Sequence, residues 1–176
     1  GSNEIEIRKQ AKKYACNILS IVQPTRFLGF PDNCMDTVAL LDIVQALEKV
    51  INEIEPEVIY THHIGDLNID HRITHKAVIT ACRPQPGFCV KEIYAFEVLS
   101  STEWQTPGVK AFYPNVFVDI ADYIDFKKQA LEAYFEEMRQ SPHSRSIDNA
   151  IRLNALRGNT VGLDYAEAFM LLRKIK

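Results

Sequence analysis

The segment 58–81, VIYTHHIGDLNIDHRITHKAVITA, constrains the fold more than any other part of the sequence. It opens with a β-branched and aromatic run at 58–61, which is typical of a buried strand. It closes with apolar residues at helical spacing, which predicts an amphipathic helix up to Ala81. A strand that leads through a polar loop into a helix is the repeating unit of α/β folds.

The polar loop within this segment holds side chains of the kinds that bind ligands. They are His62, His63, Asp66, Asn68, Asp70 and His71. The loop follows the carboxyl end of the predicted strand, and ligands bind at that edge of an open α/β sheet. We therefore expect the functional site to lie in this loop and at the start of the helix that follows it.

The rest of the chain alternates between predicted helices and short predicted strands. Helices are predicted at 3–21, from an N-cap at Asp36 to Pro56, at 122–138 and at 147–156. Strands are predicted at 25–30, 90–99 and 115–120, while 165–175 fits either a helix or a final strand. This order predicts a Rossmann-like α/β fold with a mainly parallel sheet flanked by helices.

The chain begins with a predicted helix, whereas a Rossmann-like sheet normally begins with a strand whose loop contributes to the site. That first βα unit would take about 30 residues, and we expect it to be missing here. Gly1 and Ser2 have the sequence of a tag remnant. We therefore predict a single domain at 3–176 that lacks its N-terminal part. Its open sheet edges would favour a homo-oligomer.

The composition narrows the class of partner. The net charge of −3 provides no basic surface for nucleic acid. The four cysteines form no CxxC pair, which indicates reduced thiols in a cytoplasmic protein. No apolar run reaches membrane-spanning length, and no signal peptide is visible. We therefore expect a small-molecule partner and no membrane span.

His71 is the strongest candidate for a metal ligand, because it begins the predicted helix with Asp66 and Asp70 close by in sequence. His75 shares its helix face, but the metalloprotease pattern HExxH has a glutamate where this chain has Arg72. Catalytic zinc sites usually have three protein ligands, so one histidine leaves the site incomplete. These residues suggest metal-assisted hydrolysis with a carboxylate as general base.

Other candidate residues also have simpler interpretations. His62 and His63 end a strand and point to opposite faces, so at most one faces the site. Asp70 fits both a helix N-cap and a carboxylate that orients a site histidine. Asp32 fits a ligand contact at the sheet edge or a turn after proline. Arg8 by itself fits a solvated helix face.

Five stretches of the chain resemble the PIG-L/LmbE-like N-deacetylase family. They are THHIGDLNIDHR at 61–72, LGFPDN at 28–33, SSTEW at 100–104, PHSRS at 142–146 and RGNTVGLDYAEAF at 157–169. The resemblance covers nearly the whole chain. It implies a Rossmann-like fold and zinc-dependent removal of the acetyl group from N-acetylglucosamine-like sugars or their conjugates.

The resemblance also implies roles for individual residues. His71 matches the third zinc ligand, and Asp70 matches a carboxylate that holds a ligand in place. Asn68 stands where several relatives have a histidine thought to stabilise the oxyanion, and an asparagine amide can donate that hydrogen bond too. Asp66 is the further candidate to contact the reacting amide or its water.

The substrate and the remaining ligands are assigned in the same way. Arg8 and Asp32 match positions that bind substrate in relatives, and we group Arg145 of the PHSRS stretch with them. The family's first signature, His-Pro-Asp-Asp-Glu, is absent from these 176 residues. By resemblance, that motif supplies the other two zinc ligands and the general base.

Three functions follow from the sequence. The first is a zinc-dependent N-deacetylase of an acetamido sugar, with iron as the other metal that such a ligand set accepts. The second is a non-catalytic fragment or degenerate homologue that binds a sugar or a partner. The third, a nucleotide-sugar enzyme without a metal, is disfavoured because the chain has no glycine-rich phosphate loop.

Overall fold

The computed structural model describes residues 2–176, with side chains from Ile5 onward. The chain divides into two compact units, which are described separately. The first comprises Gly1–Arg26 and Phe117–Glu167, and the second comprises Phe27–Val116 and Ala168–Lys176. The predicted domain at 3–176 therefore consists of two compact units.

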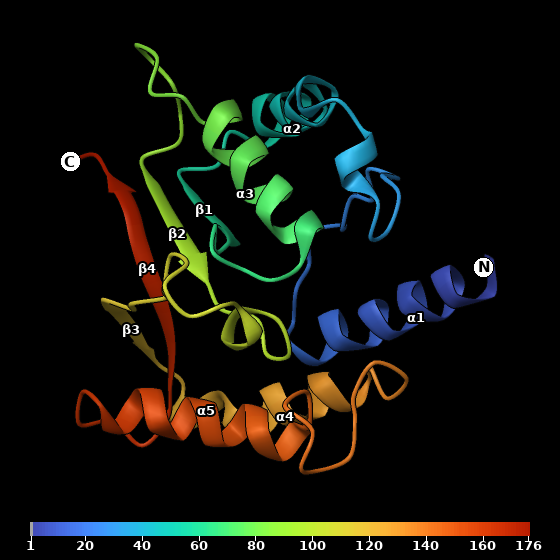
Figure 1. The fold of residues 1–176 in the computed structure, drawn as a ribbon, viewed down its shortest axis with the longest axis vertical. Coiled ribbons are helices and arrows are strands. Elements are labelled where there is room, and N and C mark those ends of the chain that lie inside the picture. The colour runs from blue at the N-terminus through green and yellow to red at the C-terminus, as the bar shows by residue number, and fades with distance from the viewer. Residues whose placement is uncertain (1) are drawn as a thin grey trace. The chain divides into compact units, whose positions relative to one another are not determined.

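The second unit contains the segment from which the fold was predicted (Figure 1). In chain order its elements are a 3₁₀ turn at Met35–Thr37, α2 at Leu40–Ile54, β1 at Val58–His62, α3 at Ile69–Ala81, β2 at Glu92–Phe96 and a second 3₁₀ turn at Thr102–Trp104. Most of β4, which spans Ala166–Lys174, also belongs to it. The strand, loop and helix predicted at 58–81 are therefore confirmed.

The sheet is mixed. Strands β1 and β2 run parallel in a register that pairs Val58 with Glu92 and His62 with Phe96. Strand β4 runs antiparallel to β2, and the hydrogen-bonded order is β1-β2-β4-β3, with β3 at Val116–Asp119. The Rossmann-like α/β class is confirmed, but the sheet is not mainly parallel, because the ambiguous segment 165–175 forms the antiparallel strand β4.

The core of the second unit lies where α2 and α3 pack beside the sheet. Its buried residues are Ile43, Val44, Ile51, Ala77, Val78, Ala81, Cys82, Val90 and Ile93. In α3, the predicted apolar spacing places Ala77, Val78 and Ala81 on the buried face of the helix. Strand β1 is less buried than its composition predicted, with Tyr60 53% exposed. Among the described residues it pairs only with β2, which leaves its other edge open.

Two local predictions are wrong. Segment 25–30 forms no strand: Gly29 has a φ of +75°, which turns the chain out of the extended conformation, and Phe27 is 59% exposed. Asp36 does not cap α2, because it lies inside the first 3₁₀ turn and the N-cap is Ala39. Both depended on neighbours that a single sequence does not reveal.

The first unit is built mainly from helices. They are α1 at Ser2–Ile18, a 3₁₀ turn at Ala121–Tyr123, α4 at Ile124–Glu132 and α5 at Ile147–Asn159. Alanines at the contacts let the helices approach closely, since Ala11, Ala15, Ala130 and Ala150 are all buried. In the part of the chain that is described, no helix is both long and apolar enough to cross a bilayer.

Candidate active site

His71 lies in the first turn of α3, at the carboxyl end of the β1 loop. The helix begins where the side-chain oxygen of Asn68 accepts a hydrogen bond of 2.8 Å from the backbone N–H of Asp70. Asn68 is therefore the N-cap, and the interpretation of Asp70 as the cap is wrong. The His71 side chain remains 22% exposed, so it is accessible from solvent.

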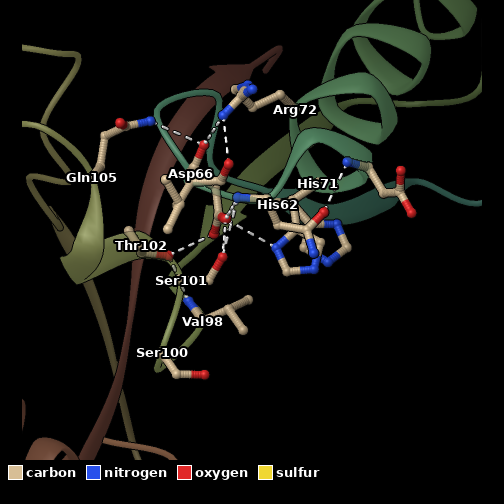
Figure 2. Close-up of polar contacts among 12 residues, drawn as sticks. His62, Asp66, His71, Arg72, Val98, Ser100, Ser101, Thr102 and Gln105 are labelled. Atoms are coloured by element: carbon tan, nitrogen blue, oxygen red, sulfur yellow. Dashed lines mark hydrogen bonds and ion pairs between the residues drawn. The ribbon is translucent and has the colours of Figure 1, made fainter. Parts of the chain in front are cut away.

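Asp66 is the carboxylate that contacts His71. Its Oδ1 atom lies 3.1 Å from Nδ1 of His71, and its side chain has no exposed surface. Asp66 also accepts hydrogen bonds from the Ser101 hydroxyl, from the Thr102 hydroxyl at 2.8 Å and from the backbone N–H of Asn68 at 2.9 Å. Figure 2 shows these contacts converging on the one carboxylate. Because it is enclosed, Asp66 is placed to orient His71 rather than to touch a substrate.

These hydrogen bonds determine the charge of Asp66. Burial alone would raise the pKa of its carboxyl, because a buried charge loses its hydration. The bonds from His71, Ser101, Asn68 and Thr102 outweigh burial and lower that pKa from 3.8 to about 2. Asp66 is therefore an anion at neutral pH. Because Nδ1 of His71 lies against Asp66, Nε2 is the ring nitrogen that is left for a ligand.

Hydrogen bonds also hold the backbone around Asp66. The Arg72 guanidinium donates to the carbonyl oxygens of Asp66 and Leu67 at 2.8 and 2.6 Å. The Gln105 amide donates to the Asp66 carbonyl at 3.1 Å, as Figure 2 also shows. The loop is thus bound both to the helix that carries His71 and to the segment that follows β2.

Gly65 permits a close approach on the other side of this loop. A Cβ atom at this position would lie 1.9 Å from the carbonyl oxygen of Lys110. That same oxygen accepts a hydrogen bond of 2.8 Å from Nε2 of His63, which is 2% exposed. His63 is therefore the buried member of the histidine pair, as the alternation of strand residues predicted.

His62 lies against His71 instead of facing solvent. The two rings stack with centroids 4.1 Å apart and planes 21° from parallel. Burial, followed by the nearby His71, lowers the pKa of His62 from 6.5 to about 4. His75 donates from Nδ1 to the His62 carbonyl oxygen at 2.7 Å, so this nitrogen anchors the strand end.

Asp70 binds the loop that carries Asp32. Its two carboxylate oxygens accept hydrogen bonds from the backbone N–H groups of Asn33 and Met35, at 2.6 and 3.0 Å. The Asn68 amide also donates to the Asn33 side chain at 3.4 Å. The predicted substrate residue Asp32 therefore sits in a loop tied to the start of α3.

Arg8 and Arg145 belong to the first unit and share one partner there. The Nε atom of Arg8 lies 2.7 Å from one carboxylate oxygen of Glu137, and a guanidinium nitrogen of Arg145 lies 3.5 Å from the other. The two predicted substrate residues, far apart in sequence, are thus joined through Glu137. Sequence reasoning did not single out this glutamate.

The described residues do not complete a zinc site. Nowhere in residues 5–176, whose side chains are described, do three His, Cys, Asp or Glu side chains gather as metal ligands. The carboxylates nearest His71 in sequence, Asp66 and Asp70, already hold neighbouring groups. His71 is the one candidate that combines an orienting carboxylate with exposed surface.

Several residues that build the site were missed from the sequence. They are Ser101, Thr102, Gln105 and Arg72. A signal for the first three was present, because the SSTEW stretch follows a predicted strand. Loops that follow two parallel strands lie at the same edge of a sheet. That edge brings the β2 loop to the β1 loop.

A family model described as "PIG-L: GlcNAc-PI de-N-acetylase" matches residues 2–82. This match spans α1, α2, β1 and α3, and therefore the His71 and Asp66 pair. It confirms the resemblance that the THHIGDLNIDHR and LGFPDN stretches indicated.

Solved structures share the fold over nearly the whole chain. The N,N'-diacetylchitobiose deacetylase of Pyrococcus horikoshii superposes with a TM-score of 0.73 at 16% identity, over 96% of this chain and 64% of its own. GalB of Pseudomonas putida, the 4-carboxy-2-hydroxymuconate hydratase, superposes with a TM-score of 0.70 at 23% identity, over 97% of this chain and 73% of its own. The zinc-inhibited form of the teicoplanin deacetylase Orf2 superposes with a TM-score of 0.69 at 15% identity, over 97% of this chain and 75% of its own.

These likenesses, all below 25% identity, show the fold alone. The chain spans about two thirds of the length of the chitobiose deacetylase and about three quarters of the other two. Residues 2–82 thus carry the sequence pattern of the PIG-L de-N-acetylase family, and the chain has the Rossmann-like fold found in solved deacetylases.

Proposed function

We propose that the protein containing this chain is an N-deacetylase, an amide hydrolase that removes the acetyl group from an N-acetylglucosamine-like sugar or sugar conjugate. The observation that carries the proposal is the pair of His71 and Asp66, whose contacting atoms lie 3.1 Å apart at the carboxyl end of β1. The pair falls inside the segment that matches the de-N-acetylase family model. Two of the solved structures with this fold are, by name, deacetylases of N,N'-diacetylchitobiose and of teicoplanin.

The contacts of these residues support distinct roles. Asp66 fixes Nδ1 of His71, so that the Nε2 lone pair can act as a ligand. Asn68 uses its side-chain oxygen as the helix cap and keeps its amide N–H groups as donors. One of these donors reaches Asn33 at 3.4 Å, and the other is suited to a carbonyl oxygen of the acetamide. Asp32 is proposed to contact the sugar, while the substrate roles of Arg8 and Arg145 in the first unit stay predictions from the family resemblance.

The family resemblance implies zinc, which would polarise the acetamide carbonyl and lower the pKa of a bound water. Of the described residues, only His71 is arranged to hold the ion, and one ligand is not a site. We therefore propose that the other ligands come from residues outside those described.

A second candidate function is a sugar-binding domain without catalysis. The incomplete ligand set favours it. The GalB likeness adds a third chemistry, hydration, on the same fold. The fold alone therefore does not decide among these three functions, and an assay of acetate release separates the first from the second.

The test is to incubate the protein with N-acetylglucosamine and with N,N'-diacetylchitobiose and to measure acetate and free amine. The proposal predicts equal amounts of acetate and amine, from at least one of these probes. Saturable binding of the sugar without acetate release would replace it with the binding function. Neither binding nor acetate release would reject both.

A further inference from the structure

His62 contacts the candidate ligand His71 face to face. His62 is the last residue of β1, and His71 lies in the first turn of α3. Their ring centroids are 4.1 Å apart with an interplanar angle of 21°, and Figure 2 shows the two rings side by side. A stacked aromatic ring restricts the tilt of its neighbour through packing.

The same residue is also anchored to α3 through its backbone. Nδ1 of His75 donates to the His62 carbonyl oxygen at 2.7 Å. His71 and His75 are four residues apart on one helix, so they lie on the same helix face. Both histidines of α3 therefore engage His62, one through its ring and the other through its carbonyl group.

The other neighbour of the His62 ring is Phe96. Its centroid lies 4.8 Å from that of His62, and the β1–β2 register pairs these two residues directly. The Nδ1 atom of His62 is buried and has no hydrogen-bond partner among the described residues. This nitrogen therefore adds no hydrogen bond to the contact with His71, which is made by the aromatic face.

The contact between Asp66 and His71 supports one edge of the imidazole ring, where Nδ1 lies 3.1 Å from the carboxylate oxygen. It leaves the two faces of the ring to be packed by neighbouring groups. The flat ring of His62 lies against one of these faces. Asp66 and His62 together thus define both the direction and the plane of the His71 imidazole.

We propose that His62 is a positioning residue for His71: its stacked ring holds the imidazole plane of His71, and His75 holds His62 in place for that purpose. The proposal rests on the proposed function in one respect, because it concerns His71, which is assigned the role of metal ligand in that function. The positioning itself is a property of the chain and is measurable without substrate or metal.

The experiment is nitrogen NMR of the ¹⁵N-histidine-labelled chain, with His62→Ala and His62→Phe as a matched pair. Phenylalanine retains an aromatic face, whereas alanine removes it. The wild type and His62→Phe are expected to show one set of His71 ring-nitrogen signals, with cross-ring contacts between residues 62 and 71. His62→Ala is expected to lose this single set of signals, because its His71 ring exchanges between orientations.

Backbone amide shifts of the α2 core residues Ile43, Val44 and Ile51 verify that each variant is folded. If His62→Ala does not fold, His62→Leu replaces it, since leucine fills the space without a flat face. An unchanged His71 spectrum in His62→Ala, or in His62→Leu where that variant replaces it, would overturn the proposal. Absence of the cross-ring contact in the wild type would overturn it as well. If the spectra are as expected but the protein releases no acetate, the proposed function is rejected and the positioning role of His62 stands.

Discussion

Oδ1 of Asp66, a carboxylate with no exposed surface, lies 3.1 Å from Nδ1 of His71. Ser101 and Thr102, which follow another strand, bind the same carboxylate. The site is therefore a histidine oriented by a buried anion, whose other hydrogen bonds come from the Asn68 backbone and from a loop that is distant in sequence.

Replacing Asp66 with asparagine keeps the shape of the side chain and removes its charge. Because the contact to His71 and the hydroxyl bonds favour the anion, we expect a loss of deacetylation of about 10- to 100-fold. We also expect a loss of about 1–3 kcal/mol in the free energy of unfolding. Asp42→Asn, an exposed aspartate in the first turn of α2, is the matched control and should change neither.

Stability should depend on pH through the same carboxylate. The pKa of Asp66 falls from 3.8 to about 2 on folding, so the folded state favours the anion. The group therefore contributes about 2 kcal/mol above pH 4, and this contribution disappears as the pH falls through about 2. Urea unfolding of wild type and Asp66→Asn from pH 2 to 7 should show the stability difference growing with pH. A difference independent of pH would contradict this assignment.

Gly65→Ala should disturb the site loop without changing a polar group. The added Cβ would lie 1.9 Å from the Lys110 carbonyl oxygen, so we expect a loss of about 3 kcal/mol in unfolding free energy. Gly87→Ala is the comparison, since its Cβ meets no atom within 4 Å but its φ is +78°. It should cost about 1–2 kcal/mol. Equal costs for the two variants would show that the loop can move away from Lys110.

The local structure around His71 was predictable because its signals lie within a few residues. The β-branched run at 58–61 forms β1, and the polar residues before the apolar spacing of α3 supply its cap. Segment 25–30 also holds apolar and aromatic residues, yet it forms no strand. A strand requires a hydrogen-bonded neighbour, and the identity of that neighbour is not a local property of the sequence.

The partners of the site residues were harder to predict for the same reason. Asp66 and Ser101 are 35 positions apart, and Arg8 and Glu137 are 129 apart. Which carboxylate reaches His71 also depends on geometry. Asp70 is the nearest carboxylate in sequence, but its oxygens accept hydrogen bonds from the backbone of Asn33 and Met35. The carboxylate that contacts His71 is Asp66.

The buried thiol of Cys82 should be unreactive in the folded protein. Burial raises its pKa to about 11, so little thiolate is present at pH 8. Cys34, by contrast, is exposed. Treatment with a disulfide thiol reagent at pH 8 should label Cys34 rapidly and Cys82 only after unfolding, as peptide mapping would show. Rapid labelling of Cys82 in the native protein would contradict the described core.

Metal content tests the incomplete ligand set. Because the described residues do not gather three ligands, the chain should retain far less than one zinc after dialysis against a weak chelator. Retention of one zinc per chain, lost in His71→Ala, would show that the chain holds a complete site of its own.

The most direct test of the proposed function is acetate release by the protein and by its His71→Ala variant, with N,N'-diacetylchitobiose and N-acetylglucosamine as substrates. We expect the wild type to release acetate and His71→Ala to release it at least about 100-fold more slowly, because the variant lacks the oriented imidazole. Asp42→Asn should retain full activity. Unchanged acetate release in His71→Ala would contradict the account.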